Sequence, residues 1–431
     1  MLEYDKGCDC MDKNEFTLEQ YRLNESRVIR DAIHGYITFE YLPIWQLIAT
    51  AEVQRLRRIK QLGGTYMVFP SAEHSRFTHS LGVYETVRKM CALDEIDKHL
   101  NDYEKLTVMC AGILHDIGHG PFSHTFEGAF HTNHEEMTRR MILEDSEVHQ
   151  VLKSVHEDLP LDVANVIAHK ASKPMIVQMV SSQLDADRMD YLLRDSYFAG
   201  VTYGEFDRSR ILRTLRIKDD RIVFKYSGVQ AIEDYILARY HMYYQVYFHP
   251  TARSYEHVFQ LIAKRLTVLY EQGYHFQTNI QYLLPFISGE KMSVAEYEAL
   301  DENVIYYYIG EMQNEDDAIL SDLCQRFINR HLFKYESIND ASEIEEYRKK
   351  TIEKGLDPDY YVVDDEAIQV PYKHYGVGKH TGEIEILMED GTISTLSDTS
   401  HIVNAILHSK PKIDRKVFFV RNSNWRKETD E

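Results

Sequence analysis

The chain has 431 residues, of which 44% are hydrophobic, so it is long enough to bury a large core. Its 69 acidic and 49 basic side chains leave a net charge of -20, which argues against a protein that coats nucleic acid or binds an anionic membrane. The sequence shows neither a signal-peptide pattern nor an apolar run of membrane-spanning length, and we therefore expect a cytoplasmic protein.

The cysteines are few and scattered, at positions 8, 10, 91, 110 and 324. This number and spacing do not predict a disulfide framework, which fits a reducing compartment. Cys8 and Cys10 could bind a metal ion together, but a lone pair of cysteines is weak evidence for a site.

The first predicted element is a short strand at residues 37–39. From Ile44 to about Tyr335, apolar residues recur at three- and four-residue spacing with few prolines, which predicts a helical core. Within this core, residues 222–226 follow an Asp-Asp-Arg turn and predict a short strand or hairpin insertion. We expect these β segments to decorate the helices rather than to form a second domain.

The pattern changes towards the C-terminus. Residues 343–354 are highly charged and predict an exposed helix that joins two regions. Short apolar runs then predict strands at 360–363, 383–387 and 416–420, with a turn at 389–392. We therefore expect a mostly α protein in which residues 1–340 form an N-terminal segment plus the helical core, and residues 341–431 form a small α+β region.

The densest polar cluster follows the apolar run 109–114. It contains His115, Asp116, His119, His124 and Glu127 within thirteen residues. A His–Asp pair at the end of an apolar helix is costly to bury unless it has a function, and the glycines and proline at 118–121 would loosen the helix there. A single histidine could simply cap free carbonyls, but three histidines with two carboxylates favour metal binding or catalysis.

Two further segments add candidate residues. Arg76 and His79 stand at the start of an amphipathic helix, where backbone N–H groups attract anions. Asp187, Tyr191 and Asp195 recur every four residues and hence share one face of a helix. An exposed charged face paired to neighbouring arginines explains that last segment equally well.

Histidines and carboxylates together make a mixed nitrogen and oxygen site. Such a site suits Mg, Mn, Fe or Zn and leaves positions open for water and a phosphate oxygen. An ion held there would activate water and neutralise the charge of a phosphoryl group while an imidazole transfers a proton. The cluster therefore predicts hydrolysis of a phosphate ester.

The order His79, His115-Asp116, Asp187 resembles the H…HD…D pattern of the HD-domain superfamily of metal phosphohydrolases. Four segments are similar, more narrowly, to the deoxynucleoside triphosphate (dNTP) triphosphohydrolases of bacteria and then to the animal SAM-and-HD-domain dNTPase: residues 54–64, 76–83, 115–126 and 185–195. The resemblance implies a helical HD-domain core and a divalent metal ion held by His79, His115, Asp116 and Asp187, with Asp187 rather than Asp185 as the ligand. Mg or Mn is the expected ion, with Fe, Zn or Ni as alternatives.

The same resemblance implies catalytic roles for neighbouring residues. His124 would protonate the leaving 5′ oxygen, and Glu127 and His134 would relay protons to it. His119 would lie beside the α-phosphate, and Arg76 would hold a phosphate with its fixed fork of donors.

The resemblance also extends to the substrate side. The matching residues are Gln61, Leu62, Arg188, Tyr191, Asp195, Arg253, Tyr255 and His257. Among these, Arg188 and Arg253 would hold phosphates, and Tyr191 would exclude the 2′-hydroxyl of a ribonucleotide. Gln61, Leu62 and Asp195 would contact the deoxyribose. One phosphate-binding arginine of the animal relative has no clear counterpart, which leaves the γ-phosphate contacts open.

Members of this family are commonly tetramers that a nucleotide activates by binding at an interface. The residues that align with parts of that activator site are Arg27, Val28, Gln54, Arg57, Asp207 and Arg210. Ala49 and Arg30 replace an Asp and an Asn of the animal enzyme, so the identity of the activator stays open. We expect a homotetramer and an activator of the dGTP or GTP type, with a deoxynucleotide favoured.

Two other segments have ordinary interpretations. The tyrosines between residues 235 and 248 could stack on single-stranded nucleic acid, but packing within helices is the simpler explanation. The basic run Arg55, Arg57, Arg58 and Lys60 could be a solvated face, but its place inside a family-like segment favours nucleotide contact.

We therefore predict an enzyme that hydrolyses a dNTP at the α-phosphorus to deoxynucleoside and intact triphosphate, and so controls dNTP pools. Another HD phosphohydrolase, acting on a monophosphate, a cyclic nucleotide or an alarmone, is the first alternative. A nucleotide-binding scaffold with an inactive HD site is the second. Nucleic-acid binding or cleavage is least favoured, because of the net charge of -20.

Overall fold

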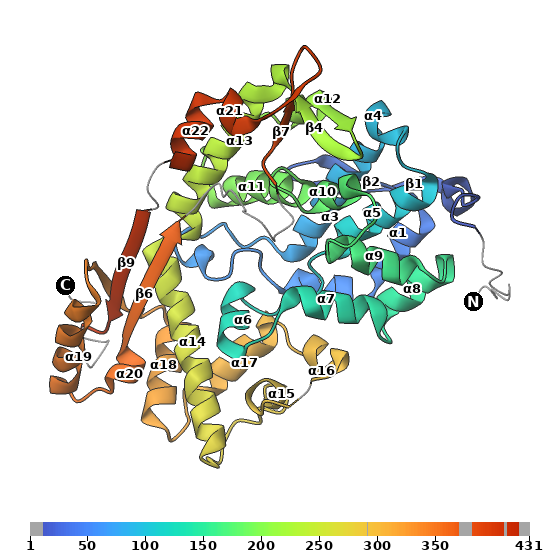
Figure 1. The fold of residues 1–431 in the computed structure, drawn as a ribbon. Helices are drawn as coiled ribbons and strands as arrows, with labels where there is room; N and C mark the ends of the chain where they lie inside the picture. The colour runs from blue at the N-terminus through green and yellow to red at the C-terminus, as the bar shows by residue number, and fades with distance from the viewer. Residues whose placement is uncertain (1–11, 291, 370–381, 409–411, 422–431) are drawn as a thin grey trace.

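Helices make up most of the structure, a computed structural model that describes residues 12–290, 292–369, 382–408 and 412–421 (Figure 1). The expected mostly α protein with small β elements is confirmed. Cys91, Cys110 and Cys324 are buried free thiols, whereas Cys8 and Cys10 lie outside the described residues. In these described ranges, no helix combines the length and the apolar composition that crossing a membrane requires.

An antiparallel hairpin precedes the helical core. Its strands are β1 (Arg22–Asp31) and β2 (Gly35–Tyr41). The strand predicted at residues 37–39 lies in β2, which buries Ile37 and Phe39 completely. The longer β1 was not predicted, because most of its side chains are exposed and show no alternation of apolar and polar residues.

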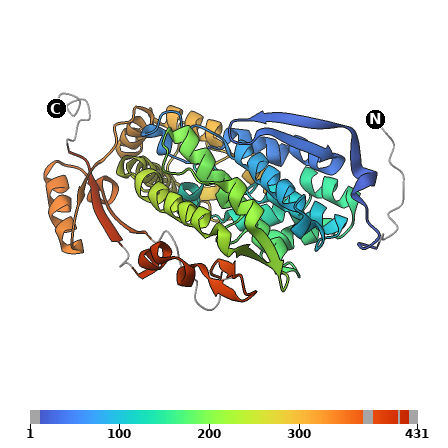
Figure 2. The same ribbon diagram turned by 90° about the horizontal axis from the view of Figure 1, so that it is seen from above.

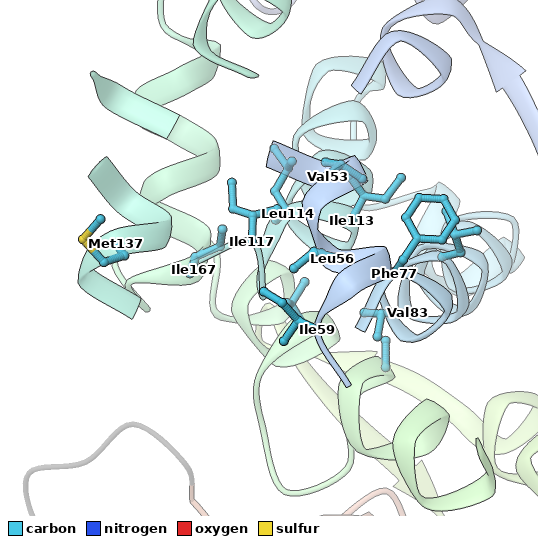
Figure 3. Close-up of a cluster of buried hydrophobic side chains, with 14 of the residues drawn as sticks. Val53, Leu56, Ile59, Phe77, Val83, Ile113, Leu114, Ile117, Met137 and Ile167 are labelled. Carbon is cyan, nitrogen blue, oxygen red and sulfur yellow. The ribbon is translucent and has the colours of Figure 1, made fainter. Parts of the chain in front are cut away.

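The helices of the core begin directly after this hairpin. Up to residue 199 they are α1 (Leu42–Ala49), α2 (Ala51–Arg55), α3 (Arg76–Cys91), α4 (Asp94–Asp97), α5 (Asp102–Leu114), α6 (His124–Phe130), α7 (His134–Leu143), α8 (Glu147–Val155), α9 (Leu159–Ile167), α10 (Pro174–Val180) and α11 (Ala186–Ala199). Helix α3 packs against both α5 and α11. Figure 3 shows the buried apolar cluster to which α2, α3, α5, α7 and α9 contribute side chains. Each fully buried side chain such as Leu114 contributes about 1.5 to 3 kcal/mol, which anchors the end of α5.

Local sequence determines where α5 and α11 begin. Asn101 and Glu104 form a capping box at the start of α5. The side chain of Asp185 accepts a hydrogen bond from Arg188 N and caps α11, which ends at Gly200 with a φ of 70°. Helix α5 ends at Leu114, and the residues that follow it form a non-helical turn.

The second half of the core contains a β hairpin and a long helix. Its elements are α12 (Arg208–Thr214), β3 (Leu215–Lys218), β4 (Arg221–Lys225), α13 (Val229–Met242), α14 (Pro250–Glu271), α15 (Leu284–Ile287), α16 (Val294–Glu298), α17 (Glu302–Met312) and α18 (Ala318–Ile328). The predicted insertion at residues 222–226 is therefore confirmed as a hairpin with β3. The tyrosine-rich segment forms the end of α13 and a π-helical turn at Tyr243–Tyr247, as expected of residues that pack within helices.

The C-terminal part adds strands to the core. It comprises β5 (Lys334–Ser337), α19 (Ile344–Glu353), α20 (Pro358–Tyr361), β6 (Val362–Gln369), β7 (Glu385–Leu387), β8 (Ile393–Thr395), α21 (Leu396–Thr399), α22 (His401–His408) and β9 (Lys412–Phe419). The predicted exposed helix is α19. Tyr360 and Tyr361 lie in α20 rather than in a strand, because Pro358 starts a short helix that Asp357 caps.

Two sheets cross residue 341. One has the order β3-β4-β7-β8, in which β7 pairs parallel to β4, and the other has the order β5-β9-β6. The core hairpin is therefore not a free decoration, since C-terminal strands extend it. Figure 2 shows the β6 and β9 strands at the opposite end of the molecule from the β1–β2 hairpin.

Candidate metal centre and active site

Helix α3, the turn after α5 and the start of α11 bring two histidines and two carboxylates together. His79 Nε2 lies 3.1 Å from Asp187 Oδ1 and 3.8 Å from Asp116 Oδ2. His115 Nε2 lies 3.4 Å from Asp116 Oδ1 and 3.7 Å from Asp187 Oδ1. Two ligands that are each about 2.1 Å from one ion stand at most about 4.2 Å apart, and each of these four distances is within that limit. The ligand atoms of His79, His115 and Asp187 all lie within 4.8 Å of one another, and Asp116 borders this group.

The histidine nitrogens are oriented for metal binding. Nε2 of His79 and Nε2 of His115 are buried and make no hydrogen bond. The Nδ1 atoms on the opposite side of each ring make hydrogen bonds: His79 Nδ1 lies 2.9 Å from Asp190 Oδ2, and His115 Nδ1 lies 3.0 Å from Gly112 O. Nε2 of each ring therefore faces Asp187, and without an ion the two histidines share their Nε2 protons with its carboxylate. A divalent cation would take the place of those protons.

Both carboxylates of the cluster are held ionised. Burial opposes ionisation of Asp187, but His115 and His79 outweigh it and lower its pKa. Burial likewise opposes ionisation of Asp116, whose pKa falls because of His115 and the guanidinium of Arg76. Arg76 forms an ion pair with Asp116 and donates from Nε to Ser123 Oγ at 2.8 Å, so it borders the candidate metal centre.

The start of α11 separates the two candidate aspartates. Asp185 accepts from Arg188 N at 2.7 Å and from Ser182 N at 2.6 Å, and it forms an ion pair with the Arg188 side chain. Asp187 instead faces the histidines. The alternative of an exposed charged face does not describe this helix, since Arg194 and Asp195 are 0% and 1% exposed.

A second polar cluster adjoins the first. Glu127 accepts from His124 Nδ1 at 2.8 Å and from His134 Nδ1 at 2.7 Å. The ring of His134 stacks on that of His119 with centroids 3.9 Å apart, and His119 Nε2 lies 3.5 Å from Asp116 Oδ1. The contacts therefore run without a gap from Asp116 to His124, whose side chain is 74% exposed.

Charge and burial differ along this second cluster. Burial opposes ionisation of Glu127, but hydrogen bonds from His124 and His134 lower its pKa. Burial and the charge of Arg76 keep the pKa of His119 well below its usual value, so this imidazole is neutral. The ligand atoms of Asp116, His119 and His134 also lie within 4.8 Å of one another, which makes them a further group that could hold an ion.

The sugar-side candidates lie along α11 and the segment before α3. The ring of Tyr191 lies 6.4 Å from that of His79 and 6.2 Å from that of Tyr247. Asp195 accepts from His74 Nε2 at 2.7 Å and from the Tyr247 hydroxyl at 2.8 Å.

Gln61 and Leu62 belong to the segment before α3. The backbone N–H of Gln61 donates to His74 O at 3.0 Å. Its side-chain Oε1 is buried without a hydrogen-bond partner, and Leu62 is partly buried against the core. Gln61 is therefore joined through His74 to Asp195, and its Oε1 is free to accept a hydrogen bond.

The candidates on α14 are engaged by the C-terminal sheet. Arg253 forms ion pairs with Asp365 of β6 and Asp414 of β9, and His257 Nε2 lies 2.8 Å from Asp365 Oδ2. Tyr255 is 1% exposed, and its hydroxyl contacts those of Tyr66 at 3.0 Å and Tyr306 at 2.7 Å. Tyr255 thus packs among core tyrosines.

The basic run before α3 does not form one face. Arg55 is 2% exposed and donates to the carbonyls of His119 and Leu300, so it is neither solvated nor free to contact a nucleotide. Arg58 pairs with Asp301. Burial of Arg55 instead supports the turn that carries His119.

The activator-site candidates lie on three separate elements. Arg27 and Val28 are exposed on β1. Arg57 Nε donates to Gln54 Oε1 at 2.8 Å, and Asp207 caps α12 by accepting from Arg210 N at 2.9 Å. Across the described residues, no hydrogen bond or ion pair joins these three pairs.

Sequence reasoning missed three residues that support the site. Asp190 and His74 hold His79 and Asp195, and His34 Nε2 lies 2.7 Å from Asp190 Oδ1. Asp190 lies on α11 between Asp187 and Arg194, and its spacing from Arg194 could have indicated a paired carboxylate.

The HD domain family matches residues 76–195, and the HD-associated region matches residues 206–278. The first match spans all four residues of the candidate metal centre. The chain belongs to the HD-domain phosphohydrolases.

Two relatives match nearly the whole chain. An uncharacterized protein of Bacillus subtilis, YwfO, is 47% identical over 409 residues, which is 93% of this chain and 94% of that protein. A crystal structure of a phosphohydrolase from Bacteroides thetaiotaomicron covers 92% of this chain and 100% of its own, with a TM-score of 0.82 and 29% identity.

Named triphosphohydrolases match about half of the chain. The deoxynucleoside triphosphate triphosphohydrolase SAMHD1 of Mus musculus is 35% identical over 236 residues, which is 46% of this chain and 36% of that protein. The SAMHD1 homolog of Dictyostelium discoideum is 33% identical over 250 residues, 54% of this chain and 48% of that protein. The chain thus spans about half or less of these two relatives.

Proposed function

We propose that this protein hydrolyses dNTPs to deoxynucleoside and inorganic triphosphate in the cytoplasm and thereby limits dNTP pools. The observation that carries the proposal is the continuous path from the metal ligand Asp116 through His119, His134 and Glu127 to exposed His124. This path joins a candidate metal centre to a candidate proton donor. The similarity to SAMHD1 over about half of the chain favours a dNTP as the substrate.

His79, His115, Asp116 and Asp187 would hold the divalent ion, with Mg or Mn as the expected metal. When bound, such an ion supplies a Lewis acid that activates water and neutralises phosphate charge. Arg76 borders this centre and can direct further N–H groups at a phosphate oxygen. Arg188, already fixed by Asp185, is the second candidate for phosphate binding.

His124 is the candidate general acid for the leaving 5′ oxygen. Its Nδ1 is turned to Glu127, so a proton on the exposed side of the ring stands on Nε2. Glu127 orients both His124 and His134, and its low pKa keeps it a proton acceptor. Loss of this carboxylate would leave the ring of His124 free to rotate.

Selectivity for deoxyribose would come from α11. Tyr191 stands beside the His79 ring, and Asp195 is held in place by His74 and Tyr247. A bulky, fixed tyrosine next to the metal centre would clash with a 2′-hydroxyl. Gln61 and Leu62 complete the proposed sugar pocket.

Nucleotide activation in a homotetramer would explain the exposed candidates of the activator site. Arg27, Val28 and Gln54 face solvent or lie near it in one chain, and Arg57 and Arg210 are exposed cations. A neighbouring subunit could bring these pairs around one nucleotide of the dGTP or GTP type. Asp207 would then be the acidic member of that site.

Product analysis tests the proposal most directly. Purified protein is incubated with Mg²⁺ or Mn²⁺ and each dNTP, singly and in mixtures, and the products are separated by anion exchange. We expect deoxynucleoside and tripolyphosphate, with turnover in mixtures that exceeds turnover of single nucleotides. Orthophosphate or pyrophosphate would move the reaction to another phosphate, and nucleotide binding without any product would support the scaffold alternative.

A further inference from the structure

Asp190 is a completely buried carboxylate whose acceptor positions are all in use. Its Oδ1 accepts from His34 Nε2 at 2.7 Å and from Arg194 Nη2 at 3.0 Å. Its Oδ2 accepts from His79 Nδ1 at 2.9 Å and from Arg194 Nε at 2.8 Å. A carboxylate offers about four lone-pair sites, so neither histidine can turn a lone pair towards Asp190.

The proton that Asp190 demands on His79 Nδ1 determines what the other side of the ring can do. A neutral imidazole with its proton on Nδ1 has a lone pair on Nε2. That Nε2 is the buried atom without a hydrogen bond that faces Asp187. We propose that Asp190 is a positioning residue for the metal centre, because it fixes both the orientation and the tautomer of the ligand His79.

The carboxylate is itself held from two further elements. Arg194 Nη1 donates to Asp31 Oδ2 at 2.8 Å, and Asp31 Oδ1 accepts from the backbone N–H groups of Ile33 and His34 at 2.9 Å each. Arg208, at the start of α12, has its Nη1 3.4 Å from His34 Nδ1. The turn between β1 and β2 is therefore part of the support of a metal ligand.

Space and charge around Asp190 leave little freedom. A Cβ atom on Gly82 would stand 1.9 Å from Asp190 Oδ1 and 2.5 Å from Arg194 Nη2, so only glycine allows α3 and α11 to approach this closely. The negative charges of Asp31 and Asp190 are balanced by the positive charges of Arg194 and Arg208. The four hydrogen bonds and the close approach of Gly82 therefore hold the Asp190 side chain in one orientation.

The test measures Mn²⁺ affinity of the full chain by calorimetric titration, which needs no substrate. Asp190→Asn keeps the shape but replaces acceptor positions with N–H donors, and loss of such a support typically weakens metal binding about 10- to 100-fold. We expect that loss. Asp322→Asn is the matched control, because Asp322 and Arg326 on α18 form an ion pair with the same spacing of four residues. The Mn²⁺ affinity of this variant should equal that of the wild type.

A second pair of variants keeps the test valid if Asp190→Asn does not fold. His34→Gln retains an N–H donor for Asp190 and should bind Mn²⁺ nearly as tightly as the wild type, whereas His34→Leu should bind more weakly. Equal affinity in all folded variants would overturn the role of Asp190. This role rests on the proposed metal site, and a wild-type protein that binds no Mn²⁺ would overturn that site instead.

Discussion

Asp185 and Asp187 lie two residues apart at the start of α11, yet alanine at each position should have a different effect. Asp187 Oδ1 lies within 3.1 Å of His79 Nε2 and 3.7 Å of His115 Nε2, so Asp187→Ala removes a charged member of the metal centre. Losing a Lewis acid removes several kcal/mol of transition-state stabilisation. About 4 kcal/mol corresponds to roughly a thousand-fold in rate, and we expect at least that loss of turnover.

Asp185→Ala provides the matched comparison. The lost helix cap costs about 1 kcal/mol, and leaving the N–H of Ser182 without its acceptor costs about 1 to 3 kcal/mol more. We therefore expect Asp185→Ala to lower the free energy of unfolding by about 2 to 4 kcal/mol. The variant should still bind one equivalent of the ion per site. Asp187→Ala should keep the helical content and melting behaviour of the apo protein.

Elemental analysis after dialysis against Mn²⁺, together with thermal melts and dNTP turnover, checks both variants. The reasoning fails if Asp187→Ala retains metal and activity. It also fails if Asp185→Ala, rather than Asp187→Ala, loses the metal, because Asp185 would then be the metal ligand.

Further predictions concern the substrate side and the proton path. Tyr191→Ala should raise the ratio of ribonucleotide to deoxynucleotide kcat/KM about tenfold or more, since steric discrimination of this size is common; an unchanged ratio would remove Tyr191 from the sugar pocket. Glu127→Gln should lower kcat about a hundredfold while Mn²⁺ content stays constant, and equal kcat would exclude the proposed path. In the folded protein the pKa of Glu127 is lowered, so its ionised form stabilises the fold above about pH 4, and this contribution is lost as the pH falls further. The melting temperature of Glu127→Gln should therefore decline less below about pH 4 than that of the wild type. Asp365→Asn should release His257, leave Arg253 with Asp414 alone and lower the KM for dNTP, whereas Asp364→Asn, which loosens only Arg415, should not; a higher KM would show that Asp365 organises Arg253 for binding.

The candidate metal residues could be recognised from the sequence because each carries a local sign. His115 and Asp116 are adjacent polar residues after an apolar run, and Asp187 begins a four-residue series on one helix. The helical core was predictable for a similar reason, since apolar spacing reports burial of one helix face. The structure brings His115 and Asp187 into one group with His79, and Asp116 lies 3.4 Å from His115.

The residues that support the site are harder to recognise from the sequence. Asp190 and Arg194 have the spacing of an ordinary surface pair, and only the fold shows that both are buried and that His34 is their third partner. Arg253 and His257 meet Asp365 more than a hundred residues further on, so no local window contains the pair. Tyr255 is aligned with a substrate segment but turns into the tyrosine cluster, because its helix face packs on the core.

The strand pairings that cross residue 341 have a consequence for biosynthesis. Strand β4 finds its partner β7 only after about 160 further residues, and β5 waits for β9 at residues 412–419. Neither sheet can close on the ribosome until its C-terminal strands β7, β8 or β9 have been made, whereas the helices around the candidate metal centre involve nearer contacts and can form earlier. A polypeptide released early would therefore contain the metal-binding helices but leave the buried guanidinium of Arg253 without its carboxylates, a state that cellular quality control can recognise.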